Sequence, residues 1–310
     1  MASTDQRLYI LDCDLSHWNN RNGRILSCRT DGSDLQTVVK DLHELPDGIA
    51  IDRARAHIYW TNMGTSGFAA NDGSIQRANL DGSNPTTILP PSSTYTPKQI
   101  AIAPLSQKLY WSDREGMRVM RANLDGTHVE TLIQTGASDA DRADKTRWCV
   151  GVAVDERSGH FYWTQKGPSK GNAGRILRAR IDGAPQASCP AARPDVEVLF
   201  DALPEPIDLE LDEARQLLYW TDRGDPPKGN TLNRAYVGEG AQGEQPRERQ
   251  ILAIRLHETI GLALDARAQV VYVTDLAGGV YRVRVDGDEG RKEVLHSELG
   301  DLTGIALSGH

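Results

Sequence analysis

A short motif centred on a tyrosine recurs along the whole chain, and this repeat constrains the fold more than any other feature. Tyr-Trp-Thr or Tyr-Trp-Ser followed by Asn, Asp or Gln occurs at residues 59–62, 110–113, 162–165 and 219–222. Weaker copies occupy residues 9–12 and 272–275. Successive tyrosines lie 50 to 57 residues apart, so six copies account for a chain of 310 residues. A fixed period of this length is typical of repeat architectures.

Each repeat contains the signals of four short strands. A segment of alternating apolar residues precedes the motif, as in residues 48–52, and a third segment follows it, as in residues 75–82. The Asp-Gly pair that ends this third segment supplies the positive φ values that a tight turn needs. A last strand follows, as in residues 86–89. Four short strands per repeat, with no segment of helical period, predict the blade of a β-propeller.

The two ends of the chain are predicted to complete one blade together. Residues 8–12 match the second strand of a blade, and residues 304–307 match a first strand without partners of its own. Pairing the two closes the ring and removes two exposed sheet edges. The sequence therefore predicts an all-β, six-bladed β-propeller with four-stranded antiparallel blades. We expect residues 1–310 to form a single propeller domain whose last blade is shared between about residues 7–40 and 302–308.

Charge and composition argue against several functions. Lysine and arginine total 35 against 43 aspartates and glutamates, a net charge of −8, which argues against nucleic acid as a partner. No run of 18 apolar residues is present, so we expect no membrane partner. The N-terminus lacks the apolar core of a signal peptide. We therefore expect a cytoplasmic protein, and the cysteines are too scattered for a disulfide framework or a zinc site: Cys13, Cys28, Cys149 and Cys189.

The repeated residues resemble those of a known family. Tyr-Trp-Thr-Asp at 219–222, Gly-Ile-Ala-Ile-Asp at 48–52 and Arg-Ala-Asn-Leu-Asp-Gly at 77–82 resemble the YWTD propeller of low-density lipoprotein receptors. The resemblance covers essentially residues 7–308 and implies the six-bladed scaffold. A stand-alone intracellular propeller of this kind also resembles, in overall type and size, fungal natural-product enzymes such as hetero-Diels–Alderases. Function is expected in the loops that such a scaffold carries.

Residues that recur in every blade are expected to build the scaffold. The motif tyrosine and tryptophan should pack between neighbouring blades, with their polar tips free to form hydrogen bonds. The motif carboxylates of Asp113, Asp222 and Asp275 should accept hydrogen bonds from backbone groups. A functional site is expected where the repeats differ.

The loops between the second and third strands differ most among the repeats. They are long in four repeats, at residues 14–23, 63–73, 166–174 and 223–230, and short in the other two. Unequal loops on a rigid scaffold commonly carry binding and catalysis. Aromatic residues outside the motifs fall on this face and, together with His17, are the predicted walls of a substrate site: Trp18, Phe68, Tyr95 and Trp148.

Polar residues just before the first strands are predicted to surround the same opening. His257 is the candidate acid–base group, because a neutral imidazole near a carboxylate exchanges protons near neutral pH. Lys98 and Glu258 are the candidate assisting groups of this catalytic set. Asp47 and Thr303 are predicted to contact the substrate.

Three functions compete at this point. The preferred hypothesis is a cofactor-free small-molecule enzyme of secondary-metabolite biosynthesis, a pericyclase or lyase that holds apolar terpene- or polyketide-type reactants and promotes dehydration or (hetero-)Diels–Alder cycloaddition. The alternative is a protein-interaction module, as the receptor propellers are. A metal-dependent lactonase using Asp47, Glu205 and Asp301 is the third. No Gly-x-Ser-x-Gly or His-Glu-x-x-His motif occurs, and no metal or cofactor is predicted.

Overall fold

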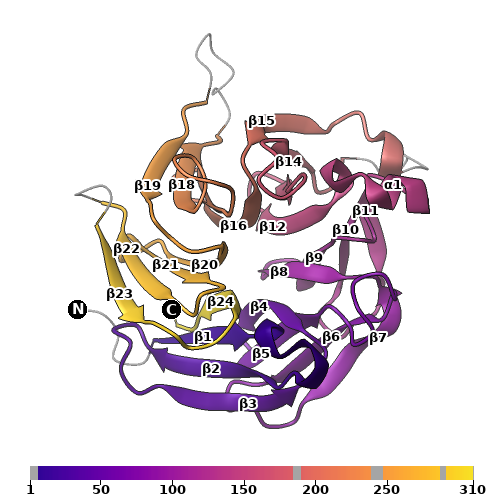
Figure 1. Cartoon of the computed structure of the whole chain (residues 1–310). Helices are drawn as coiled ribbons and strands as arrows, with labels where there is room; N and C mark the ends of the chain where they lie inside the picture. The colour runs from indigo at the N-terminus through magenta and orange to yellow at the C-terminus, as the bar shows by residue number, and fades with distance from the viewer. Residues whose placement is uncertain (1–5, 184–189, 239–246, 287–290, 310) are drawn as a thin grey trace.

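Six blades stand around a central axis in the computed structural model, which describes residues 6–183, 190–238, 247–286 and 291–309 (Figure 1). Each blade is a four-stranded sheet whose strands follow one another in sequence from the axis outward, except in the blade that closes the ring. Neighbouring strands are antiparallel, as in the pairs of the second blade. The predicted fold class is confirmed.

The strands fall into four groups by their place in the blade. The inner strands are β4 (Pro46–Asp52), β8 (Pro97–Ala103), β12 (Cys149–Asp155), β16 (Pro206–Asp212), β20 (Thr259–Asp265) and β24 (Leu302–Leu307). The second strands carry the motif: β1 (Arg7–Asp12), β5 (His57–Asn62), β9 (Lys108–Asp113), β13 (His160–Gln165), β17 (Leu217–Asp222) and β21 (Val270–Asp275).

The remaining strands complete the blades on the outside. The third strands are β2 (Gly23–Arg29), β6 (Gly73–Asn79), β10 (Arg118–Asn123), β14 (Gly174–Arg180), β18 (Thr231–Tyr236) and β22 (Val280–Arg284). The outer strands are β3 (Gln36–Leu42), β7 (Thr86–Thr94), β11 (Glu130–Gln134), β15 (Glu197–Leu203), β19 (Gln250–Ala253) and β23 (Lys292–His296). Short helical turns lie in the connections: η1 (Leu15–Asn20), α1 (Asp139–Ala143), η2 (Lys145–Arg147) and η3 (Pro190–Ala192).

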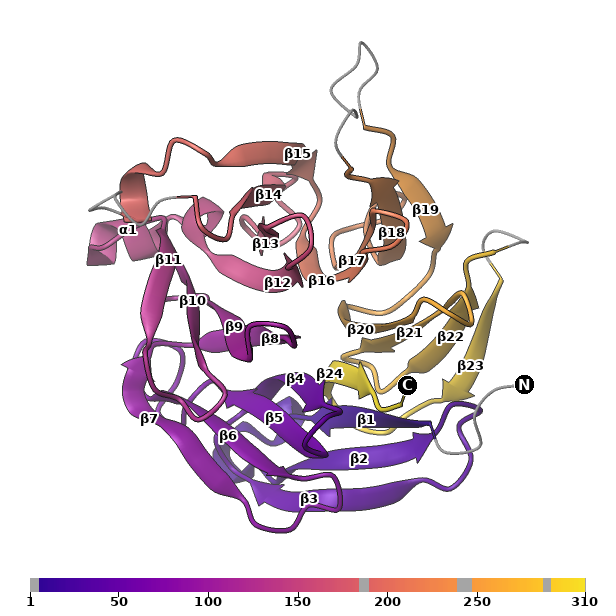
Figure 2. The same ribbon diagram turned by 180° about the vertical axis from the view of Figure 1, so that it is seen from behind.

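The ring closes between segments from the two ends of the chain. β24 pairs antiparallel with β1, with Leu8 opposite Leu307 and Ile10 opposite Ile305. The sheet β24-β1-β2-β3 is thus assembled from both ends, as Figure 2 shows from behind. The predicted pairing of the N-terminal strand with the C-terminal strand is confirmed.

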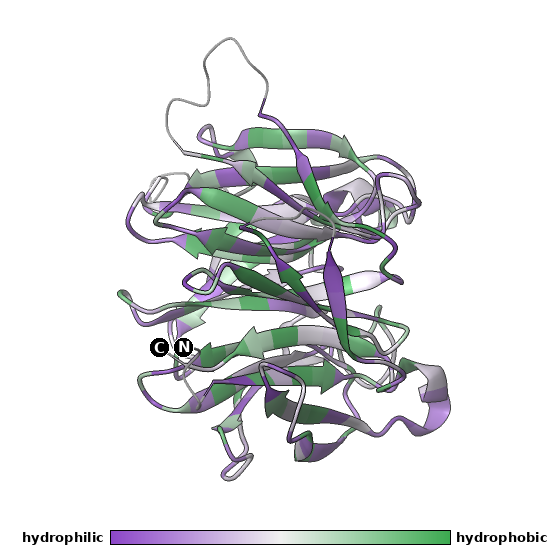
Figure 3. Cartoon of the chain, turned by 90° about the vertical axis from the view of Figure 1, so that its left-hand side faces the viewer, coloured by the Kyte–Doolittle hydropathy of each residue, from purple (hydrophilic) through white to green (hydrophobic). Residues whose placement is uncertain are grey.

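The aromatic side chains of the motif fill the spaces between blades. Trp163, for example, belongs to one apolar cluster with Val119 and Ile133 of the preceding blade. Figure 3 shows hydrophobic positions along the strands, with hydrophilic residues more frequent in the connecting loops. The four motif tryptophans are at most 1% exposed, which confirms their scaffold role: Trp60, Trp111, Trp163 and Trp220.

The third residue of the motif joins neighbouring blades through its hydroxyl group. The Thr164 hydroxyl accepts a hydrogen bond from the Gly151 N–H, in the inner strand of the same blade, at 2.7 Å. It donates a hydrogen bond to the Ile207 carbonyl, in the inner strand of the next blade, at 2.8 Å. The hydroxyls at the same position of four other blades also donate to the next inner strand, at 2.5 to 2.9 Å: Thr61, Ser112, Thr221 and Thr274.

The closing blade makes the equivalent bond from another strand. Leu11 occupies the motif position there, and the Thr303 hydroxyl of β24 donates instead to the Pro46 carbonyl of β4 at 3.2 Å. Hydroxyl groups therefore link each of the six inner strands to the next.

The motif carboxylates hold the segments that lead into the inner strands. Asp113 accepts the Tyr95 N–H at 2.9 Å. Asp222 and Asp275 each accept a backbone N–H of the corresponding segment at 3.0 Å. The expected backbone role of these three carboxylates is confirmed.

The cysteines that the structure describes are unpaired thiols. Cys13, Cys28 and Cys149 are free and buried, and burial raises the pKa of the Cys13 and Cys149 thiols to about 12. Cys189 lies outside the described residues. No helix in the described part of the chain is long and apolar enough to cross a membrane.

We predict that Trp220→Ala lowers the free energy of unfolding by about 3–5 kcal/mol, because it removes a large buried side chain and leaves a cavity. Trp18→Ala is the matched control. Its indole is 41% exposed, so the change should stay within about 1 kcal/mol. Urea unfolding measures both variants. A Trp220→Ala protein as stable as the Trp18→Ala protein would contradict the scaffold role of the motif.

Candidate functional site

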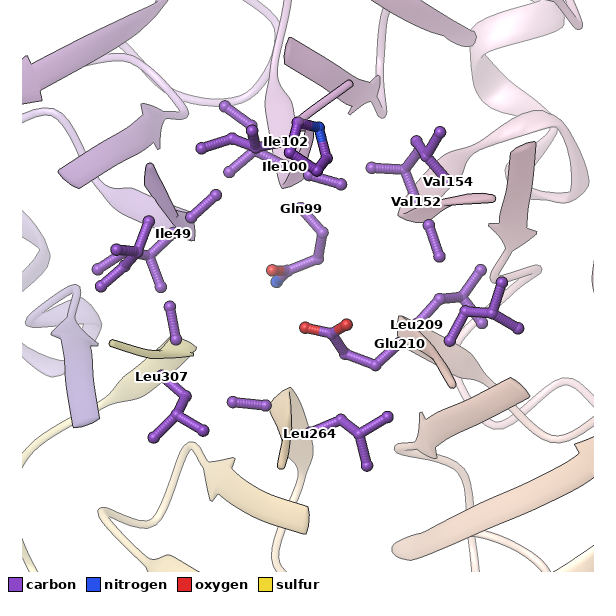
Figure 4. Close-up of a pocket in the computed structure, with 18 of the residues that line it drawn as sticks. Ile49, Gln99, Ile100, Ile102, Val152, Val154, Leu209, Glu210, Leu264 and Leu307 are labelled. Carbon is purple, nitrogen blue, oxygen red and sulfur yellow. The ribbon is translucent and has the colours of Figure 1, made fainter. Parts of the chain in front are cut away.

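A cavity of about 650 Å³ runs along the central axis (Figure 4). All six inner strands contribute to its wall. The lining continues into residues of the hairpins between first and second strands: Arg53, Pro104, Gln107 and Glu213. The cavity therefore opens on the face that carries these short hairpins, which we call the hairpin face.

At its other end the cavity is closed by the second residue of each inner strand. These six side chains are all buried, and we call them the plug: Asp47, Lys98, Val150, Ile207, Ile260 and Thr303. Val150, Ile207 and Ile260 come from three different blades and form one apolar cluster. On the opposite side, Lys98 Nζ donates to Asp47 Oδ1. These contacts between blades fill the axis, so the cavity is blind at this end.

Small residues at two positions of the inner strands set the width of the cavity. The fifth residue is alanine in five strands: Ala50, Ala101, Ala153, Ala263 and Ala306. The third residue is glycine in four strands: Gly48, Gly151, Gly261 and Gly304. A Cβ atom on Gly304 would lie 2.6 Å from the Asp47 carbonyl oxygen of the next inner strand. Neighbouring inner strands thus approach so closely that a side chain has little room at this position.

Three larger polar residues break this pattern. Gln99 and Asp208 stand where the other strands have glycine, and Glu210 stands where they have alanine. In Figure 4 the Gln99 amide and the Glu210 carboxylate point toward each other across the cavity. Gln99 Nε2 also donates to Asp47 Oδ2 of the plug at 3.3 Å. The wall around these groups is mainly aliphatic: Ile49, Ile102, Val154, Leu209, Leu264 and Leu307.

Burial governs the titration of both acids. It raises the pKa of Glu210 to about 7, against the opposing positive charge of Arg53. It also raises the pKa of Asp208 well above the ordinary value, although the carboxylate accepts the N–H groups of Leu262 at 3.0 Å and Leu209 at 2.9 Å. A carboxyl group with a pKa near 7 occurs in both protonation states at neutral pH. Glu210 is therefore suited to accept a proton and to return it.

The sequence prediction missed Asp208 and Glu210, although the sequence contains a signal for both. Aligning the sequences of the six inner strands shows both acids. Glu210 stands at the fifth position, which is alanine in the other five strands, and Asp208 stands at the third position, which is glycine in four strands. The signal is a single residue that departs from the repeated pattern of the inner strands. It does not depend on the length of a loop.

Three of the predicted site residues lie in the plug. Asp47 and Lys98 form a buried ion pair, and burial lowers the pKa of the Lys98 ammonium despite that partner. The Thr303 hydroxyl makes the bond that closes the ring of inner strands. None of the three lines the cavity, and their predicted contacts with a substrate stay predictions.

The four predicted aromatic residues do come together, on the face opposite the cavity opening. The rings of Trp18 and Phe68 meet edge to face with centroids 5.7 Å apart. The Arg114 guanidinium lies 4.6 Å from the centroid of Phe68 and 5.0 Å from that of Trp148. The Tyr95 hydroxyl donates to a carbonyl beside Phe68 at 2.7 Å. We call these five residues the aromatic face; they do not line the central cavity.

The predicted histidines are exposed and lie apart from the cavity. His17 Nδ1 lies 2.6 Å from Asp14 Oδ1, and this hydrogen bond raises the pKa of the imidazole. His257 lies two residues before β20, which stands across the ring from the strand β8 of Lys98. Glu258 lies 3.4 Å from an arginine of the preceding blade. The structure does not gather His257, Lys98 and Glu258 around one point, and their catalytic roles stay predictions.

The acids that the lactonase hypothesis singled out bind groups of the protein itself. Glu205 Oε1 lies 2.8 Å from Lys166 Nζ and 2.6 Å from Arg223 Nη2. Asp301 accepts a hydrogen bond from the Ser16 hydroxyl at 2.7 Å. Among the described residues, no group of three or more His, Cys, Asp or Glu side chains is placed to hold a metal ion.

The architecture defines the class of this protein as a six-bladed propeller with YWTD-type repeats, although no family model matches the chain. A protein of Pyricularia oryzae named low-density lipoprotein receptor-related protein 1 is 58% identical over 309 residues, which cover 97% of each chain. The chain belongs to the family of that protein. A 3-hydroxyacyl-CoA dehydrogenase-like protein of Cochliobolus heterostrophus, LAM1, is 40% identical over 316 residues. This match covers 99% of our chain and 66% of the relative.

Solved structures support the fold alone. The propeller in a nidogen/laminin complex superposes with a TM-score of 0.72 at 21% identity and covers 98% of both chains. A gluconolactonase of Xanthomonas campestris superposes with a TM-score of 0.58 at 16% identity, covering 84% of this chain and 78% of that one. Propellers of one architecture thus occur both in a protein complex and in an enzyme.

We predict that Glu210→Ala makes the stability of the protein less dependent on pH. Glu210 has a pKa of about 7 in the folded protein against 4.5 in its ordinary state. Between these values the folded protein holds a proton that the unfolded chain has lost, so wild-type stability falls as pH rises, by up to about 1.4 kcal/mol per unit. At pH 8 the alanine variant should be the more stable protein.

Urea unfolding at pH 5, 6, 7 and 8 measures this slope. Glu248→Ala is the control, because Glu248 is an exposed glutamate outside the cavity, and its slope should match the wild type. Equal slopes for the wild type and Glu210→Ala would show that Glu210 titrates as an ordinary surface acid.

Proposed function

We propose that this protein is a cofactor-free enzyme that binds an apolar small molecule in the central cavity and transfers a proton with Glu210. One observation carries the proposal. Glu210 replaces an alanine of the scaffold and lies in an aliphatic cavity that raises its pKa to about 7. The fold needs only a methyl group at this position, and an ionisable group there is costly because it is desolvated. Such a group indicates a role in catalysis.

The cavity favours proton transfer by its shape and by its walls. Its blind end and its aliphatic side chains restrict the orientations of a bound molecule. A correctly placed acid–base group contributes about 10²- to 10⁴-fold to a rate. Gln99 points into the same space and offers a second hydrogen-bonding group that orients the substrate.

Dehydration, the reaction class that the sequence suggested, needs only these groups. The Glu210 carboxylate takes a proton from a substrate O–H, N–H or C–H bond, and the resulting carboxylic acid protonates a leaving hydroxyl group. Water departs, a double bond forms, and Glu210 is again a carboxylate. The unsaturated product stays between aliphatic walls, where a cycloaddition of secondary-metabolite type gains from near-attack geometry. The reactants expected from the sequence, apolar terpene or polyketide metabolites, match this lining.

A test compares wild type, Glu210→Gln and Glu248→Gln against a panel of hydroxylated terpenoid and phenolic metabolites. Stabilising ligands are found by thermal melting, and dehydration is followed by mass spectrometry as loss of water. We expect Glu210→Gln to bind the same ligands as wild type but to lose at least about 100-fold in rate. Glu248→Gln should retain the wild-type rate. Wild-type turnover by Glu210→Gln would remove Glu210 from the mechanism.

A second function, protein binding, is favoured by the aromatic face. Trp18 is 41% exposed there and lies 4.6 Å from the Arg21 guanidinium, and tryptophan and arginine are the residues that most often dominate protein interfaces. The nidogen/laminin complex shows that a propeller of this fold occurs in a protein assembly. Trp18→Ala would then abolish partner binding while ligand binding in the cavity continues, because the plug separates the two surfaces.

A further inference from the structure

The charged residues of the cavity wall are mostly acidic. β16 contributes Asp208 and Glu210, and the hairpin after it contributes Glu213 at the rim. β4 and its hairpin contribute Asp52 and Arg53. The parts of the wall that come from β8, β12, β20 and β24 contain no charged residue. A bound molecule therefore meets four carboxyl groups and one guanidinium group.

The rim acids have cations of their own, and the interior acids do not. Asp52 Oδ2 lies 3.0 Å from Arg55 Nη1, and Glu213 Oε2 lies 3.5 Å from an arginine of the neighbouring hairpin. Within the described residues, neither Asp208 nor Glu210 forms an ion pair; the hydrogen bonds of Asp208 come from backbone N–H groups. The two interior acids therefore have no cation in direct contact among the described residues.

The cation of the cavity wall, Arg53, forms a hydrogen bond with the backbone of another strand. Arg53 Nη2 donates to the Leu307 carbonyl of β24 at 3.2 Å, at the open end of the cavity. An ionised carboxylate in aliphatic surroundings without a cation is costly. A ligand that carries a positive charge into the cavity would supply the missing partner.

We propose that the cavity binds an apolar primary or secondary amine as its ammonium ion, with the charge at Glu210 and Asp208 and the carbon skeleton against the aliphatic wall. This inference rests on the proposed function and names its substrate class. The Gln99 carbonyl oxygen is a further acceptor for an ammonium N–H group. The volume of about 650 Å³ is within the usual range of small-molecule sites.

An amine also agrees with the proton transfer assigned to Glu210. The ammonium group binds the carboxylate form, and its N–H bond is a source of the proton that this carboxylate accepts. Affinity should therefore increase as pH rises through about 7 and Glu210 ionises. The other charges facing Glu210 along its strand and from β4 belong to Asp208, Glu213, Asp52 and Arg53. Of these groups, only the Arg53 guanidinium repels a cationic ligand.

Three probes of one shape test the charge preference: naphthalen-2-ylmethanamine, naphthalen-2-ylmethanol and 2-naphthoate. Calorimetry at pH 6 and pH 8 measures their dissociation constants for wild type, Glu210→Gln and Ala101→Leu. At pH 8 we expect the amine to bind wild type at least about tenfold more tightly than the alcohol. Its affinity should rise about tenfold from pH 6 to pH 8, because the ionised fraction of Glu210 rises by that factor. Glu210→Gln should remove both differences.

The outcomes separate this inference from the proposed function. Ala101→Leu places extra volume on the cavity wall and should weaken the binding of every probe. Ala277→Leu, at an exposed alanine in the loop between β21 and β22, should weaken the binding of none. If no probe binds, or if Ala101→Leu has no effect, the cavity is not the ligand site and both proposals fail. If the alcohol or the naphthoate binds wild type as tightly as the amine at pH 8, the site stands and the amine class is wrong.

Discussion

The structure depends on the hydroxyl group that each blade donates to the inner strand of the next. Thr164 shows the arrangement: one oxygen accepts an N–H of its own inner strand and donates to a carbonyl of the neighbouring one. The bond needs two backbones in near contact, and the glycines at the third position of the inner strands allow that approach. In the closing blade a leucine occupies the motif position and Thr303 donates the bond from β24. The ring of inner strands is therefore continuous, even where the motif is degenerate.

This ring determines where a small molecule finds room. Because the inner strands touch, the axis is narrow, and six side chains at one level are enough to fill it as the plug. Farther along the axis the wall is built from alanine and from aliphatic side chains that leave space between them. A carboxyl group at that level is desolvated, and in the described part of the chain no cation forms an ion pair with Glu210. The unusual pKa of Glu210 thus follows from the same backbone contacts that close the ring.

The sequence predicts the scaffold well because the scaffold is repeated. Six copies of one motif identify the blades, and the scaffold roles of Trp163 and Asp113 follow from their recurrence. The candidate site is predicted poorly because it depends on contacts between strands that are distant in sequence. That Val150, Ile207 and Ile260 meet across the axis, and so close one end of the channel, cannot be read from any single repeat.

The sequence prediction gave most weight to unequal loops, whereas the cavity differs from the repeat by single residues within strands. Loops on one face do bring Trp18, Phe68 and Trp148 together, as predicted, but this is the face that the plug seals off from the cavity. Glu210 lies in a regular strand and changes only one residue of the repeat. Because loop length signals exposed surface, whereas a single residue inside a strand signals an altered interior, each kind of irregularity points to a different function.

The plug makes the two proposed functions physically independent. Asp47 and Lys98 hold one side of it by a buried ion pair, and the apolar cluster fills the other side. A protein bound on the aromatic face would contact arginine and aromatic rings that no ligand in the cavity can reach. A small molecule would enter from the hairpin face, past Arg53 and Glu213, without displacing that partner. The two proposed functions therefore do not compete for the same residues, and a single chain could carry both.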